Sequence, residues 1–240
     1  MGWEEVPLAV MVAGLAVLLG LEQWIPADRE RGERGGGWRH GAWNLGLGIF
    51  NAVVLGLLAA PLLQWATVWA EVRGFGLTRL LPLPEEVAVA VALVAFDGWM
   101  YLWHRANHAL PLLWRFHRLH HLDRAMDATT TVRFHPVEIT ISTLLRLAVL
   151  PILGLRIEHL LIYEIVLFPV ILFHHSNIRF PEHSDRVMRA VLVTPAMHRV
   201  HHSKRQVETD SNYGSVLSIW DRLGRSFRLR RDGSAIEFGL

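Results

Sequence analysis

Histidine is the residue type whose spacing points most directly to chemistry in this sequence. Eight of its fourteen histidines fall into three short clusters. The clusters read His104-Arg-Ala-Asn-His108, His117-Arg-Leu-His120-His121 and His198-Arg-Val-His201-His202. On an α-helix, positions i, i+3 and i+4 share one face, so we expect each cluster to aim two or three imidazoles at one point. Neutral imidazole binds iron, zinc, copper and nickel, and the clusters therefore predict a metal centre.

The number of imidazoles predicts two metal ions, because one tetrahedral zinc ion would need only four ligands. The adjacent pair His174 and His175 closes a long apolar run and adds to the candidate ligands. Neighbouring helical residues point about 100° apart, so both reach the site only if two metals bind or the helix ends there. We expect at least one of them to be a ligand and favour His175. Isolated histidines such as His40 and His159 are predicted to be structural.

Several polar residues near the clusters are candidate partners of the ligands. Metal-bound histidines usually donate their second ring N–H to a carboxylate or a carbonyl. Asp97 lies seven residues before His104 and shares its helical face, so we predict that it bonds a ligand or supports the site structurally. Weaker carboxylate candidates are Asp123, Asp127, Asp210 and Asp221. Arg133, His135 and Glu138 follow the second cluster, and His135 is a candidate further ligand.

The elements that must position these residues are apolar stretches of membrane-helix length. About 20 apolar residues cross a hydrocarbon core of about 30 Å. Five stretches approach this length: residues 6–24, 41–70, 86–103, 137–155 and 157–173. We therefore predict an all-α integral membrane bundle of four to five helices with a histidine-rich helical cap. Two alternatives remain open: a hairpin formed by the last two stretches, and a signal peptide at the start, which Glu4 and Glu5 disfavour.

Arginine distribution predicts the orientation of this bundle. The loop over residues 25–40 holds four arginines, whereas the loop over residues 71–85 holds two. Because basic loops stay in the cytoplasm, the first loop is predicted to be cytoplasmic and the N-terminus to lie outside. The histidine clusters and the C-terminus then share the cytoplasmic side, and we expect a bacterial inner membrane.

Composition excludes several other functions. The chain has 240 residues, 52% of them hydrophobic, and contains no cysteine. Disulfides, thiolate ligands, Cys-ligated iron–sulfur clusters and thiol catalysis are therefore excluded. Because the formal net charge is only +2 and no nucleic-acid motif is present, we predict no nucleic-acid partner.

An ordered set of motifs resembles the fatty acid hydroxylase/sterol desaturase superfamily of membrane di-iron enzymes. The matching segments are Asp97-Gly-Trp-Met-Tyr-Leu-Trp-His-Arg-Ala-Asn-His108, Leu113-Trp-Arg-Phe-His-Arg-Leu-His-His121, Arg133-Phe-His-Pro-Val-Glu138, His174-His-Ser-Asn-Ile178, Thr194-Pro-Ala-Met-His-Arg-Val-His-His202, Asp210-Ser-Asn-Tyr-Gly214 and Trp220-Asp-Arg-Leu223. The resemblance implies a catalytic domain over residues 90–230. Membrane helices and loops over residues 1–89 precede it, and a C-terminal tail over residues 231–240 follows. From its composition, the last stretch over residues 228–240 is predicted to be charged and poorly ordered.

The resemblance implies O2-dependent hydroxylation or desaturation of a lipid by two iron ions, although zinc is conceivable in the purified protein. The implied ligands are His104, His108, His117, His120, His121, His175, His198, His201 and His202, with His174 kept as a candidate. Arg133, His135, Asp210 and Asn212 lie in the motifs and are taken as neighbours of the ligands. Gly224-Arg225-Ser226 departs from the Phe-Gly-Thr that often follows Trp-Asp-Arg-Leu in this family. No fused cytochrome b5 domain is evident, so the electron donor would be separate: cytochrome b5, a ferredoxin or a similar protein with its reductase.

The lipid itself stays open between a fatty acyl chain, a sterol or hopanoid, a carotenoid and an ether lipid. Other functions of a membrane protein rich in histidine fit these residues less well. A metal transporter would place its ligands near the bilayer midplane rather than at helix ends. A di-haem carrier would pair histidines across spanning helices. A zinc-binding membrane hydrolase or a non-catalytic metal-binding membrane protein remains the alternative, because imidazole binds zinc well.

Overall fold

Five long helices form the body of the protein, as the apolar stretches predict. The computed structural model describes residues 2–230 and 235–240. The long helices are α1 (Val6–Trp24), α2 (Trp38–Val72), α4 (Glu85–Ala109), α6 (Pro136–Leu153) and α7 (Ile157–His175). Each is long and apolar enough to cross a membrane, and the described residues form no β-strand beyond isolated bridges. The prediction of an all-α membrane bundle is confirmed.

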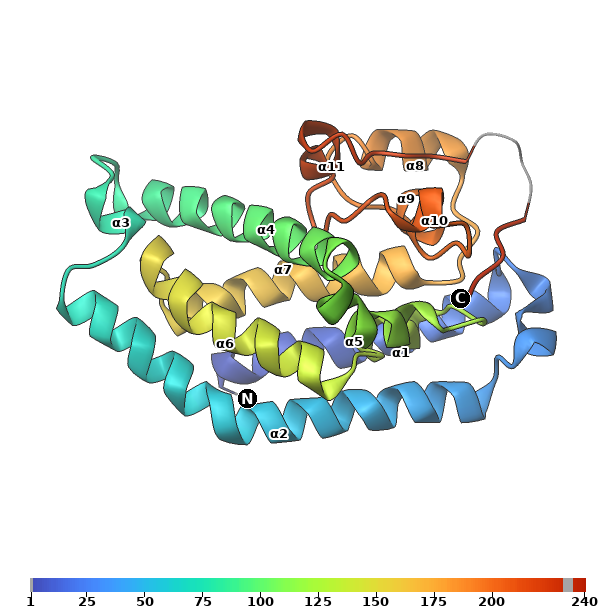
Figure 1. Cartoon of the computed structure of the whole chain (residues 1–240), viewed down its shortest axis with the longest axis horizontal. Coiled ribbons are helices and arrows are strands. Elements are labelled where there is room, and N and C mark those ends of the chain that lie inside the picture. The colour runs from blue at the N-terminus through green and yellow to red at the C-terminus, as the bar shows by residue number, and fades with distance from the viewer. Residues whose placement is uncertain (1, 231–234) are drawn as a thin grey trace.

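Short helices complete the chain and gather around the long ones. They are η1 (Trp3–Glu5), η2 (Arg29–Arg34), α3 (Leu77–Leu80), α5 (Pro111–His121), η3 (Ala128–Val132), α8 (Glu182–Met188), α9 (Pro195–His201), α10 (Gln206–Thr209) and α11 (Ile219–Leu223). Helices α8 to α11 form a cap that lies over α4 and α7 (Figure 1). The α1–α2 connection lies at the same end as the cap, whereas α3 lies at the opposite end.

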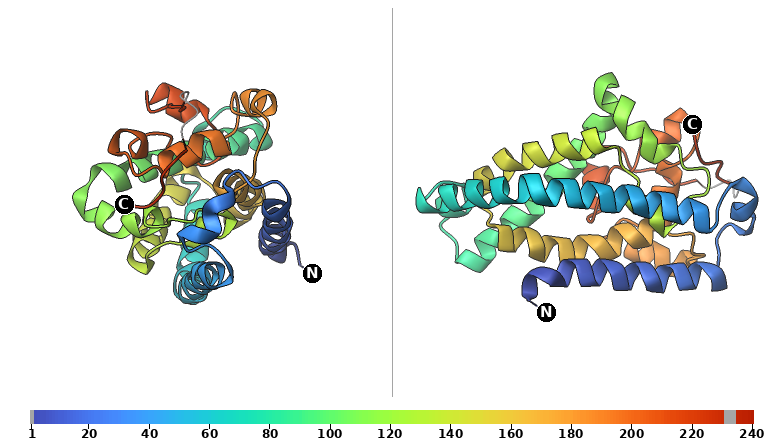
Figure 2. Two further views of the ribbon diagram at one scale, coloured as in Figure 1. Left: turned by 90° about the vertical axis from the view of Figure 1, so that its right-hand side faces the viewer. Right: turned by 90° about the horizontal axis from the view of Figure 1, so that it is seen from below.

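The long helices pack as neighbours along the bundle axis. Helix α1 lies against α7, and α2 lies against α6 (Figures 1 and 2). Helices α6 and α7 run the length of the bundle in opposite directions. Gly154, in a left-handed conformation, ends α6 and allows the chain to reverse. The two stretches thus form two membrane-length helices joined by a tight turn, so the pair starts and ends at the same end of the bundle, as a hairpin would.

The outer helices expose apolar side chains, as expected of a protein that faces lipid. Leu57, Trp65 and Val72 on α2 are exposed, and so are Leu8 and Val17 on α1. In a bilayer such residues face hydrocarbon at no cost, while the helix satisfies its own backbone hydrogen bonds.

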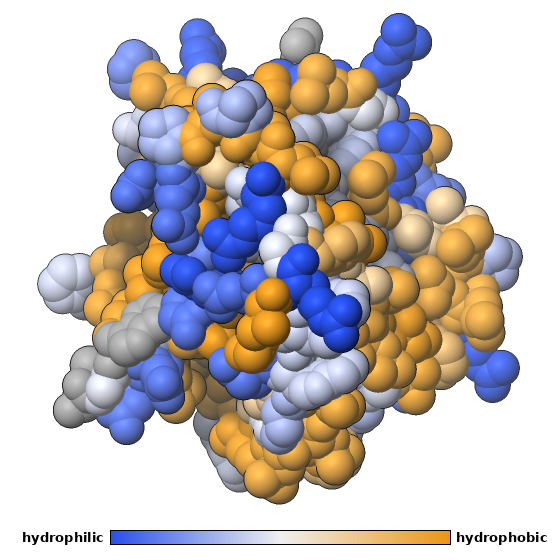
Figure 3. Space-filling view, turned by 90° about the vertical axis from the view of Figure 1, so that its left-hand side faces the viewer, coloured by the Kyte–Doolittle hydropathy of each residue, from blue (hydrophilic) through white to orange (hydrophobic). Residues whose placement is uncertain are grey.

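The end of the bundle that carries α3 has a polar centre. Hydrophilic residues gather near the middle of this end, and hydrophobic residues flank them (Figure 3). Arg156 contributes through ion pairs with Glu71 at 3.1 Å and Glu85 at 3.6 Å. Arg79 pairs with Glu71 at 3.6 Å. A polar centre of this kind suits the water interface of the membrane.

The described part of the C-terminal tail is packed, although the sequence led us to expect poor order. Residues 231–234 of that tail lie outside the described residues. Phe238 is buried and its ring contacts the Arg199 guanidinium, 4.8 Å from the ring centre. The Lys204 backbone N–H donates to the Glu237 carbonyl at 2.8 Å. An aromatic anchor and a backbone bond thus hold the tail against the segment that follows α9.

Candidate metal centre

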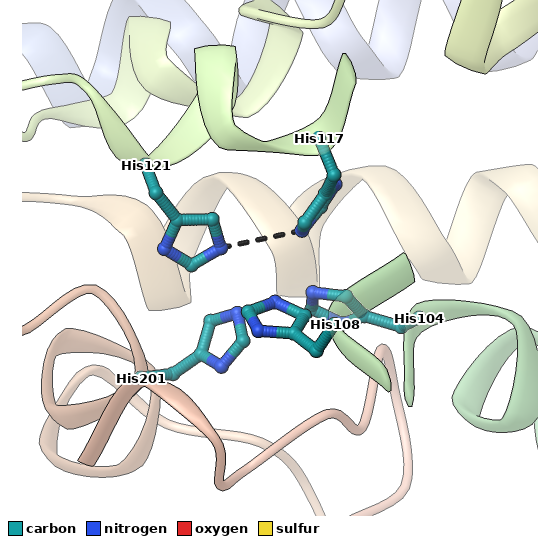
Figure 4. A group of neighbouring side chains, drawn as sticks. All are labelled: His104, His108, His117, His121 and His201. Carbon is teal, nitrogen blue, oxygen red and sulfur yellow. Dashed lines mark hydrogen bonds between the residues drawn. The ribbon is translucent and has the colours of Figure 1, made fainter. Parts of the chain in front are cut away.

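Two groups of histidines meet between the ends of α4 and α7 and the short helices α5 and α9. The first group contains His104, His108, His117, His121 and His201 (Figure 4). The second group contains His120, His175, His198 and His202. Within each group, one ligand atom of every histidine lies within 4.8 Å of the others. The structure therefore brings together all nine histidines of the implied ligand set.

Helical spacing decides which group each histidine joins. We expected each cluster to aim at a single point, but α5 and α9 each contribute to both groups. His117 and His121 join the first group while His120 joins the second. Around a helix, residue i+4 is rotated by about 40° from residue i, and residue i+3 by about 60° in the opposite direction. His121 therefore points toward the group of His117, and His120 points away from it. In α9 the assignment is reversed: His198 pairs with His202 in the second group, and His201 joins the first.

Hydrogen bonds orient the histidines and fix their protonation. Nδ1 of His104 lies 2.9 Å from the Tyr213 carbonyl, and Nδ1 of His201 lies 2.6 Å from the Ser211 carbonyl. Nδ1 of His175 lies 2.7 Å from the Ile171 carbonyl. A carbonyl only accepts hydrogen bonds, so each of these Nδ1 atoms carries the proton. Each Nε2 therefore presents a free lone pair, as a metal ligand requires.

The Nε2 atoms converge to distances that suit a shared cation. In the second group, Nε2 of His175 lies 3.1 Å from that of His120 and 3.0 Å from that of His198. In the first group, the Nε2 atoms of His117 and His121 are 3.2 Å apart. Buried ring nitrogens without a hydrogen-bond partner include Nε2 of His104 and of His201. Convergent lone pairs and orphaned buried nitrogens are what a pair of cations would satisfy.

Burial keeps the histidines of the short helices neutral. It lowers the pKa of His120, His121 and His198 well below the usual value, and neighbouring imidazoles lower it further. The same two causes lower the pKa of His201 and His202. A metal binds only the neutral form of imidazole, so this environment favours binding near pH 7.

Two predicted histidines lie outside both groups. His174 is buried and stacks on the His198 ring, with ring centres 4.0 Å apart and planes inclined by 17°. Its Nδ1 has no hydrogen-bond partner among the described residues. His135 instead caps α6: its Nδ1 accepts the Val137 backbone N–H at 3.1 Å. Local backbone bonding thus keeps His135 away from the other imidazoles.

Asp97 supports the site structurally and bonds no histidine. Its carboxylate accepts from the Tyr163 hydroxyl at 2.6 Å and from the Trp220 indole N–H at 2.8 Å. It also accepts from the backbone N–H groups of Val216 and Leu217. These bonds tie α4 to α7 and to the segment that carries the Tyr213 carbonyl. Of the two roles predicted for Asp97, the structure matches the structural one.

The remaining predicted neighbours differ in their distance from the rings. The Asp210 carboxylate lies 3.4 Å from Nδ1 of His108. Asn212 donates to the Met197 carbonyl at 2.8 Å and so holds the start of α9. Arg133 donates to the Leu119 carbonyl at 3.0 Å, beside the histidines at the end of α5. Of these three residues, Asp210 alone reaches an imidazole.

Glu138, which the sequence placed after the second cluster without a specific role, lies at the site. It is buried in the first turn of α6, and its Oε1 lies 2.7 Å from Nδ1 of His117. A carboxylate so close to a histidine fixes the ring and raises its basicity. The sequence did contain a signal for this role. Glu138 is an acidic residue in the first turn of an apolar helix, three residues after His135.

His40 belongs to a buried ionic network, although it looked isolated in the sequence. Its Nε2 lies 2.8 Å from Asp123 Oδ1, and Arg31 pairs with Asp127. Burial alone would raise the pKa of Asp123, but hydrogen bonds from His40 and Thr130 lower it to about 2. The network anchors the segment after α5 to the α1–α2 connection, so the N-terminal helices help to hold the histidines.

A cavity of about 650 Å³ leads from the histidines into the bundle. It lies between α2, α4, α6 and α7 and is lined mostly by apolar residues such as Leu55, Leu63 and Phe168. His104, His117, His120, His174, His175 and His198 line it as well. Both histidine groups therefore face a space that suits an apolar chain.

Comparison with known proteins places these features in a family. The family model described as fatty acid hydroxylase matches residues 89–226, which is more than half of the chain. No solved structure matches the chain.

Curated relatives are lipid-modifying enzymes by name. The chain is 31% identical over 157 residues to the ornithine lipid hydroxylase OlsE of Rhizobium tropici, covering 65% of this chain and 46% of the relative. It is 28% identical over 166 residues to the alkylglycerol monooxygenase of Danio rerio, covering 64% and 34%. It is 28% identical over 145 residues to the lathosterol oxidase of Mus musculus, covering 59% and 45%. The chain thus spans between a third and a half of the length of these relatives.

Proposed function

The chain belongs to the fatty acid hydroxylase family, and on this premise we propose that it is a membrane oxidoreductase that hydroxylates or desaturates a C–H bond of a lipid. It would use O2 and electrons from a separate donor. The observation that carries the proposal is the meeting of two buried histidine groups with one apolar cavity. A soluble substrate would find few polar partners there, whereas a lipid chain would bury its surface.

The two histidine groups fit a pair of iron ions. We assign one ion to His104, His108, His117, His121 and His201, and the other to His120, His175, His198 and His202. Bound iron supplies the activation of O2 and the oxidising power for an unactivated C–H bond. Neutral imidazoles with oriented lone pairs suit ferrous iron, although they also bind zinc.

The side chains of the protein position the ligands and exclude water. Glu138 and the carbonyls of Tyr213 and Ser211 hold three rings of the first group in fixed orientations. The cavity would hold the lipid chain so that one carbon lies at the metal pair, which is the main source of selectivity in such a reaction. His174 faces the same cavity and would contact the bound chain near the second group.

Localisation follows from the same features. The protein is an integral membrane protein with five helices of spanning length. We propose that the histidine end faces the cytoplasm, because the arginine-rich α1–α2 connection lies at that end (Figure 1). We further propose a bacterial inner membrane and a separate donor such as cytochrome b5 or a ferredoxin.

The substrate is proposed only as a lipid, since the relatives named above act on ornithine lipids, alkylglycerols and sterols by their names. The test is to add lipid extracts to iron-loaded protein in detergent with O2 and a reducing system, and to look for a product heavier by one oxygen or lighter by two hydrogens. The proposal predicts such a product with wild-type protein and none with His120→Ala. The matched control His183→Ala removes an exposed histidine of α8 and should keep the activity. Equal product from His120→Ala and wild type would contradict the proposal.

A further inference from the structure

A cation and a carboxylate lie deep in the apolar cavity, away from the histidines. Arg146 of α6 and Glu164 of α7 both line the cavity that reaches the metal groups. Both helices are apolar enough to cross a membrane. An ionisable residue inside a membrane segment is costly, so its position inside a cavity suggests a function.

Neither side chain uses all of its hydrogen-bonding capacity within the described residues. Nη2 of Arg146 lies 3.8 Å from the Met100 sulfur, and Nε of Arg146 is buried without a hydrogen-bond partner. The guanidinium lies 6.0 Å from the centre of the Phe96 ring. Among the residues that the structure describes, Arg146 and Glu164 attract each other but form no ion pair or hydrogen bond. Arg146 as a donor and Glu164 as an acceptor can therefore form further hydrogen bonds to a molecule in the cavity.

The two residues lie at a defined depth below the metal groups. Glu138, Ser142 and Arg146 form one stripe along α6, and all three line the cavity. Arg146 is eight residues beyond Glu138, a rise of about 12 Å along the helix. Glu164 is eleven residues before His175, a rise of about 16 Å along α7. A group bound between them would therefore lie about 12–16 Å along the helices from the histidine end of the cavity, a distance that an extended lipid chain can span.

The chemistry of the pair selects the group that it binds. A carboxylate would pair with Arg146 but would be repelled by the Glu164 carboxylate. An ammonium group would pair with Glu164 but would be repelled by Arg146. A hydroxyl group accepts a hydrogen bond from Arg146 and donates one to Glu164, so it satisfies both.

We propose that the cavity selects lipids that carry a hydroxyl group, and that this hydroxyl binds between Arg146 and Glu164. The inference rests on the proposed function, because it takes the cavity as the lipid site. Fixing the hydroxyl at this depth would determine which carbon of the chain reaches the metal pair. A site built around a hydroxyl rejects analogues that lack it, since its own polar groups would then stay unpaired.

Binding of two matched probes tests this inference without turnover. Dodecanol has one terminal hydroxyl, and dodecane has the same chain without a hydroxyl. Dissociation constants would be measured from the ligand-dependent shift in melting temperature of the purified, detergent-solubilised protein. We expect wild type to prefer dodecanol over dodecane by at least about tenfold, the effect of a hydrogen bond to a charged group. Arg146→Met should reduce this preference to below about twofold.

Two further variants complete the test. Glu164→Gln should reduce the preference as well, and it keeps the test decisive if Arg146→Met does not fold. The control Leu144→Met changes an exposed residue of the same helix and should keep the full preference. Equal binding of both probes by wild type would overturn the inference, and so would an unchanged preference in Glu164→Gln.

The outcome can be separated from failure of the proposed function. If the protein binds iron and oxidises a lipid but shows no preference for dodecanol over dodecane, only this inference fails. If it shows the preference and binds no iron, the proposed oxidation fails and a hydroxyl-selective lipid site remains.

Discussion

The two histidine groups differ in how firmly the protein holds them. In the first group, His104 and His201 bond backbone carbonyls, His117 bonds Glu138, and Asp210 approaches His108. In the second group, and among the described residues, only His175 has a hydrogen-bond partner for its Nδ1 atom. That partner is the Ile171 carbonyl. Nδ1 of His120, His198 and His202 is buried without a partner among the described residues. Hydrogen bonds to Nδ1 thus orient three of the five rings in the first group, where Nδ1 of His108 and of His121 has none within the described part of the chain, and one of the four rings in the second group. The first group also lies beside two carboxylates.

This difference teaches that ligand spacing alone does not determine how strongly a site binds its metal. Both groups draw histidines from the same short helices with the same spacing. The two groups differ in the hydrogen bonds that their Nδ1 atoms form. Such bonds fix the orientation of a ring and tune its basicity as a ligand. We expect the metal of the first group to be held more tightly than that of the second.

Loss of a ligand should have the largest effect and should distinguish the groups. His120→Ala removes a second-group ligand, and His201→Ala removes a first-group ligand. Each should abolish lipid oxidation and lower bound iron from two ions toward one per chain, while the protein still inserts into the membrane. Iron content would be measured by elemental analysis, with His183→Ala as the control. Full iron content in both variants would refute the ligand assignment.

Removing the Glu138 charge should weaken the first group selectively. Glu138→Gln keeps the size of the side chain but removes the anion beside His117, so retention of the first-group metal should fall by about tenfold or more. Competition with a chelator would measure retention. In wild type the chelator should remove the second-group metal first, and in Glu138→Gln this order should be lost. Release of both metals together from wild type would contradict the comparison.

Acid should destabilise the metal-free protein. Burial lowers the pKa of His120, His121, His198, His201 and His202. The unfolded chain has the usual pKa of about 6.5 and binds protons that the folded chain does not, so stability falls as pH drops below about 6.5. The free energy of unfolding should fall by about 1.4 kcal/mol per pH unit for each histidine that stays neutral in the folded protein. Melting temperatures between pH 8 and pH 5 would measure it, and a melting temperature that does not change would contradict this environment.

Asp97→Asn should have the smallest effect on metal binding and act on stability instead. Asp97 bonds Tyr163, Trp220 and the backbone of the C-terminal segment, and contacts no histidine. Replacing the carboxylate should lower the free energy of unfolding by about 1–3 kcal/mol while iron content stays near the wild-type value. Thermal unfolding and iron analysis on one preparation would separate the effects. A large loss of iron from a stable variant would place Asp97 at the metal site after all.

Much of this arrangement could be predicted from the sequence because it depends on local spacing. Five apolar stretches gave the five long helices, and the histidine clusters gave both groups of candidate ligands. The distribution of His120 and His201 to opposite groups could not be predicted, since it depends on how α5 and α9 face each other. The partners of His40 and Glu138 were missed for the same reason: Asp123 lies 83 residues from His40, and only the fold brings them together.

The most direct test of the central claim is a titration of metal-free protein with ferrous iron in the absence of O2. The two groups predict that two ions bind per chain, the first more tightly than the second. Addition of O2 should then change the spectrum of the loaded protein. A single binding event, or none in a correctly folded protein, would contradict the account of two histidine groups that serve as one paired metal centre.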